Sequence, residues 1–505
     1  VTGFLHLGHA LENSLMDVMV RYQRLRGKKV LLLPGTDHAA VATQAKVERL
    51  LMEKGIKNPR RDLGREKLLK EIRNYAEESK ATILKQIRKM GTSCDWSRLA
   101  YTLDSDRNKA VNEVFKKMYA DGLIYRGFRA VNWSTKGQST LSDDEIVHIE
   151  RKGKLYTFKY SKDFPFTIAT TRPETKLGDT AVAVNPKDKR YKKYIGKEFK
   201  VDFVGQPLIL KVIGDRHVDM DFGTGALGVT PAHSLVDYDM GVKNDLEMPQ
   251  VIGEDGKITK LAEKYKGLTV EQARERIVKN LKKVGLLKKT EEIDQNVGTS
   301  DRFGDVVEVL PKTQWFVDVN KKIKSRGKSL KDLMKESVGK DRINITPDRF
   351  RKIYFQWIDN LRDWNISRQI WWGHRIPVWY KDSKIKVGDK SPGKGWVRDD
   401  DTLDTWFSSG LWTFSTLGWP GNIKIQEYKN IKTEEREDIK TGDLKKFHPT
   451  NWMQMGHEIL FFWMARMILM SEYTLKEIPF KDVYIHGMLR DEKGSKISKS
   501  AGNNI

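Results

Sequence analysis

The feature that most constrains this chain is a block of β-like sequence, residues 150–296, that interrupts an α/β pattern. Before and after the block, helical periodicity alternates with short apolar runs, which is typical of sheets covered by helices. Within it, β-like runs are separated by Gly, Pro and Asp turns. One sheet split by an insertion explains this order better than three tandem domains. We therefore predict an α/β fold with a first half over 1–149, a β-rich insertion over 150–296 and a second half over 297–505.

The first forty residues predict half of a βαβ unit. An apolar face recurs through the sequence and predicts a helix over 9–26 that ends at Gly27. Residues 30–33 form an apolar run typical of a strand buried on both faces of a parallel sheet, and a loop over 34–38 follows. The apolar face comprises Leu11, Leu15, Val18, Met19, Tyr22 and Leu25.

The remaining sequence predicts further elements. Thr269 and Gln272 form a capping box, and the periodicity behind it predicts a helix that ends at Gly285. Other predicted elements are a long helix over 62–90, strands over 156–160, 164–171, 199–203, 208–213, 314–319 and 482–486, and loops over 381–400 and 421–447.

The chain is strongly basic, with 92 Lys and Arg against 68 Asp and Glu and a formal net charge of +24. This excess indicates a polyanionic partner such as nucleic acid. The alternative is that many lysines lie on solvated helix faces. The longest apolar stretch, 459–470, contains Arg466 and is too short to span a bilayer, so we expect no membrane partner. Cys94 is the only cysteine, which excludes an intrachain disulfide and an all-cysteine zinc site.

A motif near the start of the chain suits phosphate chemistry. His6-Leu7-Gly8-His9 precedes the first predicted helix, whose free N–H groups and positive dipole end favour phosphate. Gly8 permits close approach of a nucleotide. Two imidazoles can donate hydrogen bonds to oxygens that gain charge in a transition state. A structural histidine pair is the alternative.

A second motif, Lys496-Ile497-Ser498-Lys499, lies near the end of the chain. Two lysines on a polar loop can clamp a leaving pyrophosphate, whereas a solvated basic loop is the alternative. Because the sequence opens inside one motif and stops shortly after the other, we expect it to be a piece of a longer protein.

Together and in this order, the two motifs resemble the HIGH and KMSKS signatures of the class I aminoacyl-tRNA synthetases, with Ile497 where Met is usual. Within this class, further stretches resemble the valyl enzymes rather than the isoleucyl or leucyl ones. The resemblance implies a Rossmann-like parallel-sheet catalytic domain, split by an editing domain in the β-rich insertion. It also implies adenylation of valine with ATP and transfer of valine to tRNA(Val). The stretches are residues 1–6, 35–39, 367–377 and 404–409.

The resemblance also implies residues of the synthetic site. Asp37 follows a predicted buried strand, where an open α/β sheet binds ligands, and it is expected to pair with the α-ammonium of valine. An Asx turn is the alternative. Trp406, Ile459 and Trp463 are expected to line the valine side-chain pocket, although as bare sequence such residues belong to a core more often than to a pocket. The ATP site is expected to comprise His6, Gly8, His9, Gly456, Glu458, Lys496, Ser498 and Lys499, with both histidines and both lysines catalytic.

In the insertion, the resemblance implies an editing site between two walls. Thr230 and Asp237 belong to one wall, and Asp237 is expected to hold the ammonium of a misattached amino acid. Two departures from the family pattern, Gly228 for Lys and Ser234 for Asp, leave the rate of editing open. The other wall comprises Thr170, Thr171, Arg172 and Glu174, with Arg172 expected at the tRNA end or the substrate; simple β propensity is the alternative for this strand.

The same comparison bears on metals and partners. Some relatives carry zinc-binding cysteines after Trp133, where this chain has Ser134 and Thr135, so we predict no zinc. Mg²⁺ is expected with ATP. The family expectation is a cytoplasmic monomer. Two alternatives stay open from the sequence: an isoleucine substrate, and an RNA-binding protein without catalytic activity.

Overall fold

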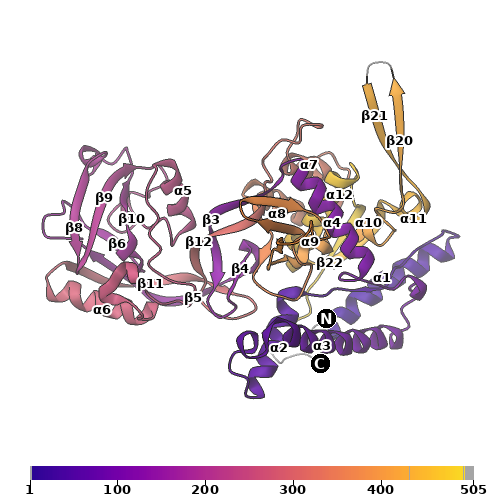
Figure 1. The fold of residues 1–505 in the computed structure, drawn as a ribbon, viewed down its shortest axis with the longest axis horizontal. Coiled ribbons are helices and arrows are strands. Elements are labelled where there is room, and N and C mark those ends of the chain that lie inside the picture. Colours follow the sequence, from indigo (N-terminus) through magenta and orange to yellow (C-terminus); the bar gives the residue numbers. More distant parts are fainter. Residues whose placement is uncertain (1–2, 431–432, 493, 495–505) are drawn as a thin grey trace. The chain divides into compact units, whose positions relative to one another are not determined.

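The computed structural model describes residues 3–430, 433–492 and 494. The chain forms two compact units, which are seen in Figure 1. Unit 1 comprises Val1–Tyr125 and Trp315–Ile505, and unit 2 comprises Arg126–Gln314. The chain crosses the boundary in β3 (Ile124–Ser134) and again in β12 (Glu308–Val317). Unit 2 contains the whole of the insertion predicted over 150–296.

Unit 1 contains most of the helices of the described chain. Its helices are α1 (Leu7–Leu25), α2 (Ala40–Glu53), α3 (Pro59–Lys89), α4 (Ser105–Ala120), α7 (Leu330–Gly339), α8 (Arg349–Asp359), α9 (Thr405–Ser409), α10 (Trp412–Ser415), α11 (Gly442–Phe447) and α12 (Ala465–Thr474). Its strands are β1 (Gly35–Thr36), β2 (Ala100–Tyr101), β13 (Asn344–Thr346), β14 (Trp364–Asn365), β15 (Ser367–Arg368), β16 (Val378–Lys381), β17 (Lys384–Val387), β18 (Val397–Arg398), β19 (Thr402–Leu403), β20 (Ile423–Asn430), β21 (Thr433–Lys440), β22 (Thr450–Gly456) and β23 (Phe480–His486).

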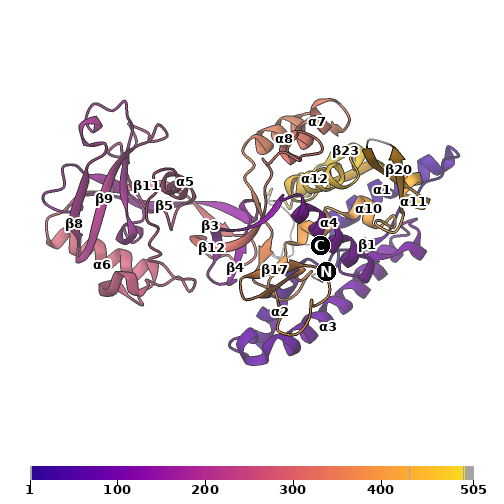
Figure 2. The same cartoon turned by 45° about the horizontal axis from the view of Figure 1, so that its top comes forward.

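Parallel strands give unit 1 its α/β character. β13, β23 and β22 form a sheet in that order, and both pairings are parallel. β1 and β2 form a second parallel pair. Parallel strands need crossover connections, and helices supply them here; Figure 2 shows α3 beside α2. The predicted α/β class is confirmed.

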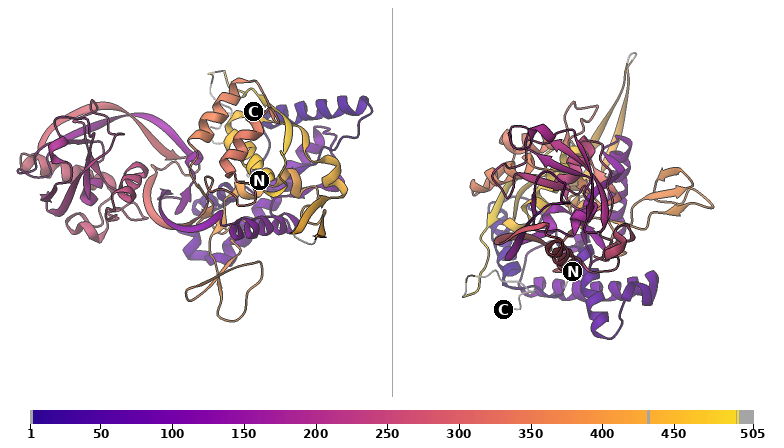
Figure 3. Two further views of the ribbon diagram at one scale, coloured as in Figure 1. Left: turned by 90° about the horizontal axis from the view of Figure 1, so that it is seen from above. Right: turned by 90° about the vertical axis from the view of Figure 1, so that its left-hand side faces the viewer.

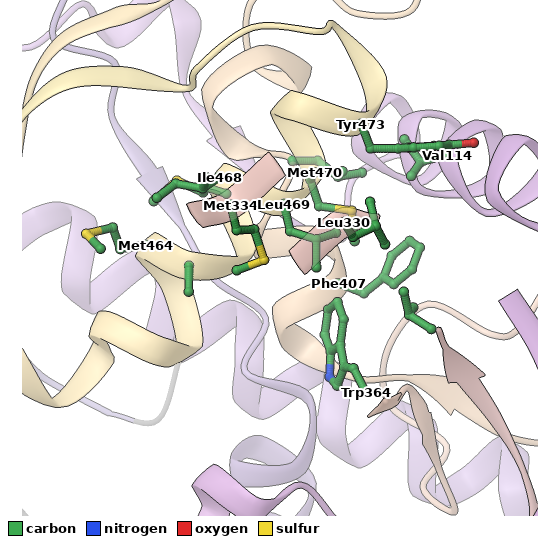
Figure 4. Packing of buried hydrophobic residues seen from close by; sticks show 14 of the residues in the cluster. Val114, Leu330, Met334, Trp364, Phe407, Met464, Ile468, Leu469, Met470 and Tyr473 are labelled. Carbon is green, nitrogen blue, oxygen red and sulfur yellow. The ribbon is translucent and has the colours of Figure 1, made fainter. Parts of the chain in front are cut away.

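The core of unit 1 is built around α12, because every residue of Ala465–Thr474 is buried. Figure 4 shows Leu330 and Met334 of α7, and Phe407 of α9, packed close to it. The one arginine of the helix, Arg466, places its guanidinium 4.1 Å from the ring centre of Trp364. This cation–π contact allows a cation to lie within an apolar helix.

Unit 2 is mainly β. One sheet has the order β10-β7-β9-β8, a second has the order β11-β5-β6, and β4 belongs to a third sheet of order β14-β12-β3-β4. β5 and β11 form a long antiparallel ladder, which is visible in Figure 3 as a pair of curved ribbons. The ladder runs from the pairing of Ile146 with Ser300 to the pairing of Phe158 with Leu287. The elements are β4 (Ser139–Leu141), β5 (Ile146–Phe158), β6 (Ile168–Thr170), β7 (Ala181–Val184), β8 (Glu198–Phe203), β9 (Gln206–Gly214), β10 (Ala226–Val229), β11 (Leu287–Ser300), α5 (Leu235–Lys243) and α6 (Val270–Lys283).

An aromatic cluster fills the main core of unit 2. Tyr160 and Phe164 meet edge to face at 5.2 Å, and Phe158 and Phe203 stack at 5.3 Å. Such pairs add about 0.5–1.5 kcal/mol each beyond the area they bury. The helix predicted from its capping box is α6, in which Thr269 and Gln272 make both capping hydrogen bonds. That prediction is confirmed.

Three predictions of local structure are wrong. Residues 30–33 form no strand, because Pro34 has no N–H and a continuous ladder begins only at Gly35. Residues 381–400 contain most of a hairpin: β16 turns into β17 over two residues, with Asp382 at a φ of 52°. Residues 421–447, also predicted as loop, contain the paired strands β20 and β21.

The apolar face predicted for α1 is a further correction, because Val18, Tyr22 and Leu25 are exposed. The last turns of this helix are held by its basic residues instead. Arg21 donates to the carbonyl of Gly91 at 2.7 Å, and Arg24 donates to the carbonyl of Ser93 at 2.8 Å. No helix among residues 3–430, 433–492 and 494 is long and apolar enough to cross a membrane.

A buried histidine ties together three segments of unit 2. His233 Nδ1 donates to the carbonyl of Val309 at 3.0 Å. Its Nε2 accepts from the N–H groups of Val251 and Ile252 at 3.0 and 3.1 Å. Burial lowers the pKa of His233 to about 3, because a charged imidazole would lose water and could no longer accept at Nε2.

This geometry predicts a pH-dependent stability of unit 2. The folded pKa lies below the unfolded value of 6.5, so the unfolded state binds more protons between pH 6.5 and about 3. Stability should therefore fall by up to about 1.4 kcal/mol per pH unit as the pH drops through that window, and this histidine should contribute no slope above it. Urea unfolding at pH 7.5 and 5.5 measures this. His233→Gln should be less stable at pH 7.5 but show a shallower slope. The exposed His217→Gln serves as control, and equal slopes in all three proteins would contradict the prediction.

Candidate active site

A cavity of about 470 Å³ in unit 1 collects most of the residues expected to bind the amino acid. It lies at the carboxyl end of β1, where an open α/β sheet commonly binds ligands. Its wall is largely apolar and aromatic, as in most small-molecule sites. The lining residues include His9 and Asn13 from α1, Asp37 after β1, Ile83 and Ile87 from α3, Cys94, Thr102, Trp406 and Ser409 from α9, Trp412, Ile459 and Trp463.

Asp37 is held as an anion by its neighbours. Thr102 Oγ1 donates to its Oδ1 at 2.8 Å, and Ser409 Oγ donates to the same oxygen at 3.3 Å. The N–H of Ala39 donates to Oδ2 at 3.1 Å. Burial favours the neutral acid, but the hydrogen bond and charge of His38, with the Thr102 hydroxyl, outweigh it and keep the pKa of Asp37 below its usual value. A fixed carboxylate in an apolar cavity suits an ammonium group.

Trp406 is positioned by the residue that starts its helix. Asp404 caps α9, and its Oδ1 accepts from the N–H of Trp406 at 3.1 Å. The other carboxylate oxygen accepts from Arg368 Nη2 and from Trp364 Nε1, both at 2.9 Å. The next residue, Thr405, accepts through Oγ1 from the N–H of Ala40 at 2.9 Å. These bonds fix the aromatic wall relative to the Asp37 turn.

Ile459 and Trp463 line the same cavity from an irregular turn. Ile459 ends the short turn His457–Ile459, and Trp463 lies in the π-helical turn Leu460–Met464. The wider turn still brings both side chains to one side, and such turns are frequent at functional sites. Trp463 Nε1 donates to the carbonyl of Ser409 at 3.0 Å, which fixes the ring.

The histidine pair builds the start of α1. His6 Nδ1 accepts from the N–H of Gly8 at 3.1 Å, and His9 Nδ1 accepts from the N–H of His6 at 3.3 Å. In a neutral imidazole the proton then lies on Nε2, so each ring keeps a donor on its far side. A Cβ at Gly8 would meet His6 Cε1 at 2.9 Å, so glycine is needed for this cap.

Of the other residues expected to bind ATP, the structure describes Gly456 and Glu458. Gly456 ends β22, and Glu458 follows it on an exposed turn. On α1, Glu12 faces His486 at 3.5 Å. Burial, with the charge of Glu458, raises the pKa of Glu12 against the opposing effect of His486. Lys496, Ser498 and Lys499 lie outside the described residues.

In unit 2, the two predicted walls of the editing site are neighbours. A Cβ at Gly228 on β10 would meet Ile168 Cδ1 of β6 at 3.1 Å. Thr170 ends β6, and its Oγ1 accepts from the N–H of Arg172 at 3.1 Å. Thr230 directly follows β10, and its N–H donates to Asp237 Oδ2 at 2.8 Å. Thr170, Thr230 and Asp237 thus belong to adjoining segments.

Arg172 and Glu174 belong to a buried ion-pair network. Arg172 Nη2 donates to Glu308 Oε2 at 2.7 Å, and its Nε donates to Glu174 Oε1 at 3.0 Å. Arg274 of α6 donates to Glu174 at 2.7 Å. Burial alone would lower the pKa of Arg172, but the two carboxylates raise it above its usual value. The network fixes this arginine in a position that the sequence could not indicate.

Comparison with known families identifies the chain. The sequence profile of tRNA synthetases class I (I, L, M and V) matches residues 1–397 and 384–505. The chain belongs to the class I tRNA synthetases. Membership of this class explains why the sequence carries two motifs suited to phosphate, at residues 6–9 and 496–499, at opposite ends of a split α/β fold.

The relatives of this class I chain include valine enzymes. A Valine--tRNA ligase of Oceanobacillus iheyensis is 46% identical over 512 residues, and one of Clostridium acetobutylicum is 44% identical over 517 residues. Both alignments cover 100% of this chain and 55% of the relative, so the chain spans about half the length of these curated relatives. Among solved structures, Mycobacterium tuberculosis methionyl-tRNA synthetase in complex with methionyl-adenylate matches at 13% identity and a TM-score of 0.49, over 100% of this chain and 58% of that one.

In this class I chain, an aspartate ties the loop after Trp133. Ser134 Oγ donates to both carboxylate oxygens of Asp305 at 2.9 Å. Thr135 Oγ1 and the N–H of Lys136 donate to Asp305 Oδ2 at 3.2 and 3.0 Å. Hydrogen bonds thus close the segment directly after Trp133. Across the described ranges, no group of three or more His, Cys, Asp or Glu side chains could hold a metal.

Sequence reasoning missed several residues of the cavity. Thr102 contacts Asp37 from 65 positions away, and no local signal marks it. Ile83 and Ile87 lie in the predicted helix over 62–90, and the sequence indicates only a helix face there, although both side chains line the cavity. Ser409 could have been predicted, because it lies in the stretch 404–409 that carries the family resemblance.

The capping aspartate of α9 offers a test of this class I site. Asp404→Asn removes the negative charge 2.9 Å from the fully buried Arg368, so unfolding free energy should fall by about 3–5 kcal/mol. The matched control is Asp400→Asn. Asp400 pairs with Arg375 at 2.9 Å but has a 79% exposed side chain, so its loss should cost under about 1 kcal/mol. Guanidinium unfolding followed by tryptophan fluorescence measures both, and equal losses would contradict the assigned importance of the buried pair.

Proposed function

We propose that this chain is the catalytic part of an enzyme that activates valine with ATP and esterifies it to tRNA(Val). The observation that carries the proposal is the convergence of Asp37, Trp406, Ile459 and Trp463 on one cavity. The two valine–tRNA ligases reported above, 44–46% identical over the whole chain, support the choice of valine.

The ammonium and the side chain of valine each have a counterpart in the cavity. The α-ammonium would pair with Asp37, whose charge its neighbours maintain. The branched side chain would lie among Trp406, Ile459 and Trp463, where no polar partner is needed. Because Trp406 stacks on Phe462 at 5.2 Å and Trp463 is bonded to Ser409, these walls are stiff enough to exclude a larger side chain. This stiffness favours valine over isoleucine.

ATP would bind at the start of α1. The Nε2 hydrogens of His6 and His9 are suited to the phosphate oxygens, and Glu458 after Gly456 is suited to accept from ribose hydroxyls. Lys496, Ser498 and Lys499 would complete the site on the pyrophosphate side. Phosphate chemistry implies Mg²⁺, which we expect to arrive with ATP and to neutralise phosphate charge there.

The reaction would need positioning more than acid–base catalysis. The valine carboxylate attacks the α-phosphate in line, and pyrophosphate leaves. A ribose hydroxyl at the tRNA 3′ end then attacks the carbonyl of the adenylate, and AMP leaves. The net charge of +24 supports a polyanionic partner of this kind. We also propose that the enzyme works as a monomer in the cytoplasm.

Unit 2 would hydrolyse threonyl-tRNA(Val). An apolar pocket can exclude isoleucine by size but cannot strongly reject threonine, a limit for which valyl-tRNA synthetases are themselves a familiar example. A second site must therefore bind the extra hydroxyl. The adjoining segments that hold Thr170, Thr230 and Asp237 support this role for unit 2.

The decisive experiment is amino-acid-dependent ATP–pyrophosphate exchange with valine, isoleucine and threonine. Strong exchange with valine, little with isoleucine and some with threonine is expected, because the pocket sorts by shape rather than by polarity. Preference for isoleucine would overturn the choice of substrate. Absence of exchange with every amino acid, in a protein that melts cooperatively, would overturn the proposed enzyme.

Asp37→Asn should separate amino acid binding from ATP binding. The amide keeps the size of the side chain but loses the charge that pairs with the ammonium. The kcat/KM for valine in exchange should fall about 10- to 100-fold, the scale of one charge-assisted hydrogen bond, while the KM for ATP stays within about twofold. Asp95→Asn, a half-exposed cap that does not line the cavity, is the control. A larger effect on ATP than on valine would contradict the role of Asp37.

A further inference from the structure

Unit 2 contains a buried lysine that none of the roles above uses. Lys176 lies in the turn Thr175–Gly178 after the threonine-rich strand, and its side chain is only 6% exposed. Its Nζ donates to the carbonyl of Gly228 at 2.7 Å, to Thr230 Oγ1 at 2.8 Å and to Asp179 Oδ1 at 3.2 Å. All three donor positions of the ammonium are thereby used, as burial of this charge requires.

Two of these three contacts are made to the end of β10, next to Asp237. The hydroxyl of Thr230 is held by Lys176 on one side and by Asp179 on the other. The N–H of the same Thr230 donates to Asp237 Oδ2 at 2.8 Å. Asp237 Oδ1 has no hydrogen bond within the described part of the chain. Lys176 therefore acts on Asp237 through a single intervening residue.

The packing around Gly228 explains why the cation comes from Lys176. A Cβ at Gly228 would overlap the hydroxyl of Tyr160 and the carboxylate of Asp179, which are hydrogen-bonded to each other. No side chain fits at 228 while this pair is in place. Gly228 is also the position where the family pattern has lysine, so this chain carries its cation on the facing segment.

When both of its carboxylates are ionised, the cluster carries one more negative charge than positive charges. Asp179 and Asp237 can carry two negative charges, and Lys176 supplies one positive charge. Burial raises the pKa of Asp179, Lys176 opposes that rise, and the charge of Asp237 adds to it. A second ammonium beside Asp237 would balance the site.

We propose that Lys176 is the positioning residue of the hydrolytic site. It takes over the place of a lysine at 228 and aligns Thr230 and Asp237 for the α-ammonium of a threonine esterified to tRNA. This inference rests on the editing function proposed for unit 2. It assigns the ammonium end of the substrate to the junction of β10 and α5, where Ser234 keeps the helix cap by accepting from the N–H of Asp237 at 3.2 Å.

The test is deacylation of purified threonyl-tRNA(Val) by the full protein, with Lys176→Met, Asp237→Ala and the double variant. Lys176→Met should lower kcat/KM about 10- to 100-fold, mainly through KM, because a misaligned carboxylate binds the ammonium poorly. In the Asp237→Ala background the same change should have little further effect, since the two residues act as one unit. Exchange with valine should be unaffected, and the exposed Lys189→Met is the matched control.

Because Lys176→Met leaves the buried Asp179 without the nearby cation, a second variant guards against misfolding. Lys176→Met with Asp179→Asn removes both charges, and its melting should show a folded unit 2 with the same loss of deacylation. Unchanged deacylation in either variant, or losses that multiply with Asp237→Ala, would overturn the role of Lys176 while the editing function stands. A wild-type protein that cannot deacylate threonyl-tRNA(Val) would instead overturn the editing function itself.

Discussion

Arg368 and Asp404 form an ion pair with almost no exposure to solvent, and the cavity beside Asp37 depends on it. Removing two charges from water is costly, so the pair persists because both carboxylate oxygens and much of the guanidinium find partners. The same carboxylate that neutralises Arg368 also starts α9 and orients Trp364 and Trp406. A polar contact in the interior thus determines the shape of an apolar wall. A purely hydrophobic core at this point would not fix the start of α9 as tightly.

The cavity is assembled from backbone that departs from regular structure. β1 has only two residues before Asp37, Ala39 adopts a φ of 46°, and a π-helical turn carries Trp463. Such conformations persist only where surrounding contacts hold them. Here the contacts are the bonds from Ala40 to Thr405 and from Trp463 to Ser409. The fully buried α12 behind the turn supplies a rigid support against which these bonds act.

Much of the fold follows from patterns of short range. The capping box of α6, the periodicity of α3 and the apolar runs at β9 and β23 were sufficient to predict these elements. The predictions failed where distant partners decide the outcome. β20 and β21 pair with each other, and composition alone cannot indicate that pairing. The exposed face of α1 is explained by Arg21 and Arg24, whose acceptors lie about 70 positions away.

The candidate site, like the fold, could be predicted from the sequence only in part. Family resemblance selected Asp37, Trp406, Ile459 and Trp463, and they line one cavity. It could not indicate Thr102, whose hydroxyl donates to Asp37 and acts with His38 to keep it ionised, because nothing near Thr102 in the sequence points to a site. Nor could it show that Lys176 reaches Gly228 and Thr230, since that contact depends on how β6 and β10 face each other.

The aromatic lining of the cavity has an optical consequence. Trp406, Trp412 and Trp463 are three of the 14 tryptophans of the chain, and all three line one ligand-sized space. Indole emission depends on the polarity and hydration of its surroundings. Filling this space would displace water from several indoles at once, so the protein carries its own spectroscopic reporter of occupancy and needs no attached dye.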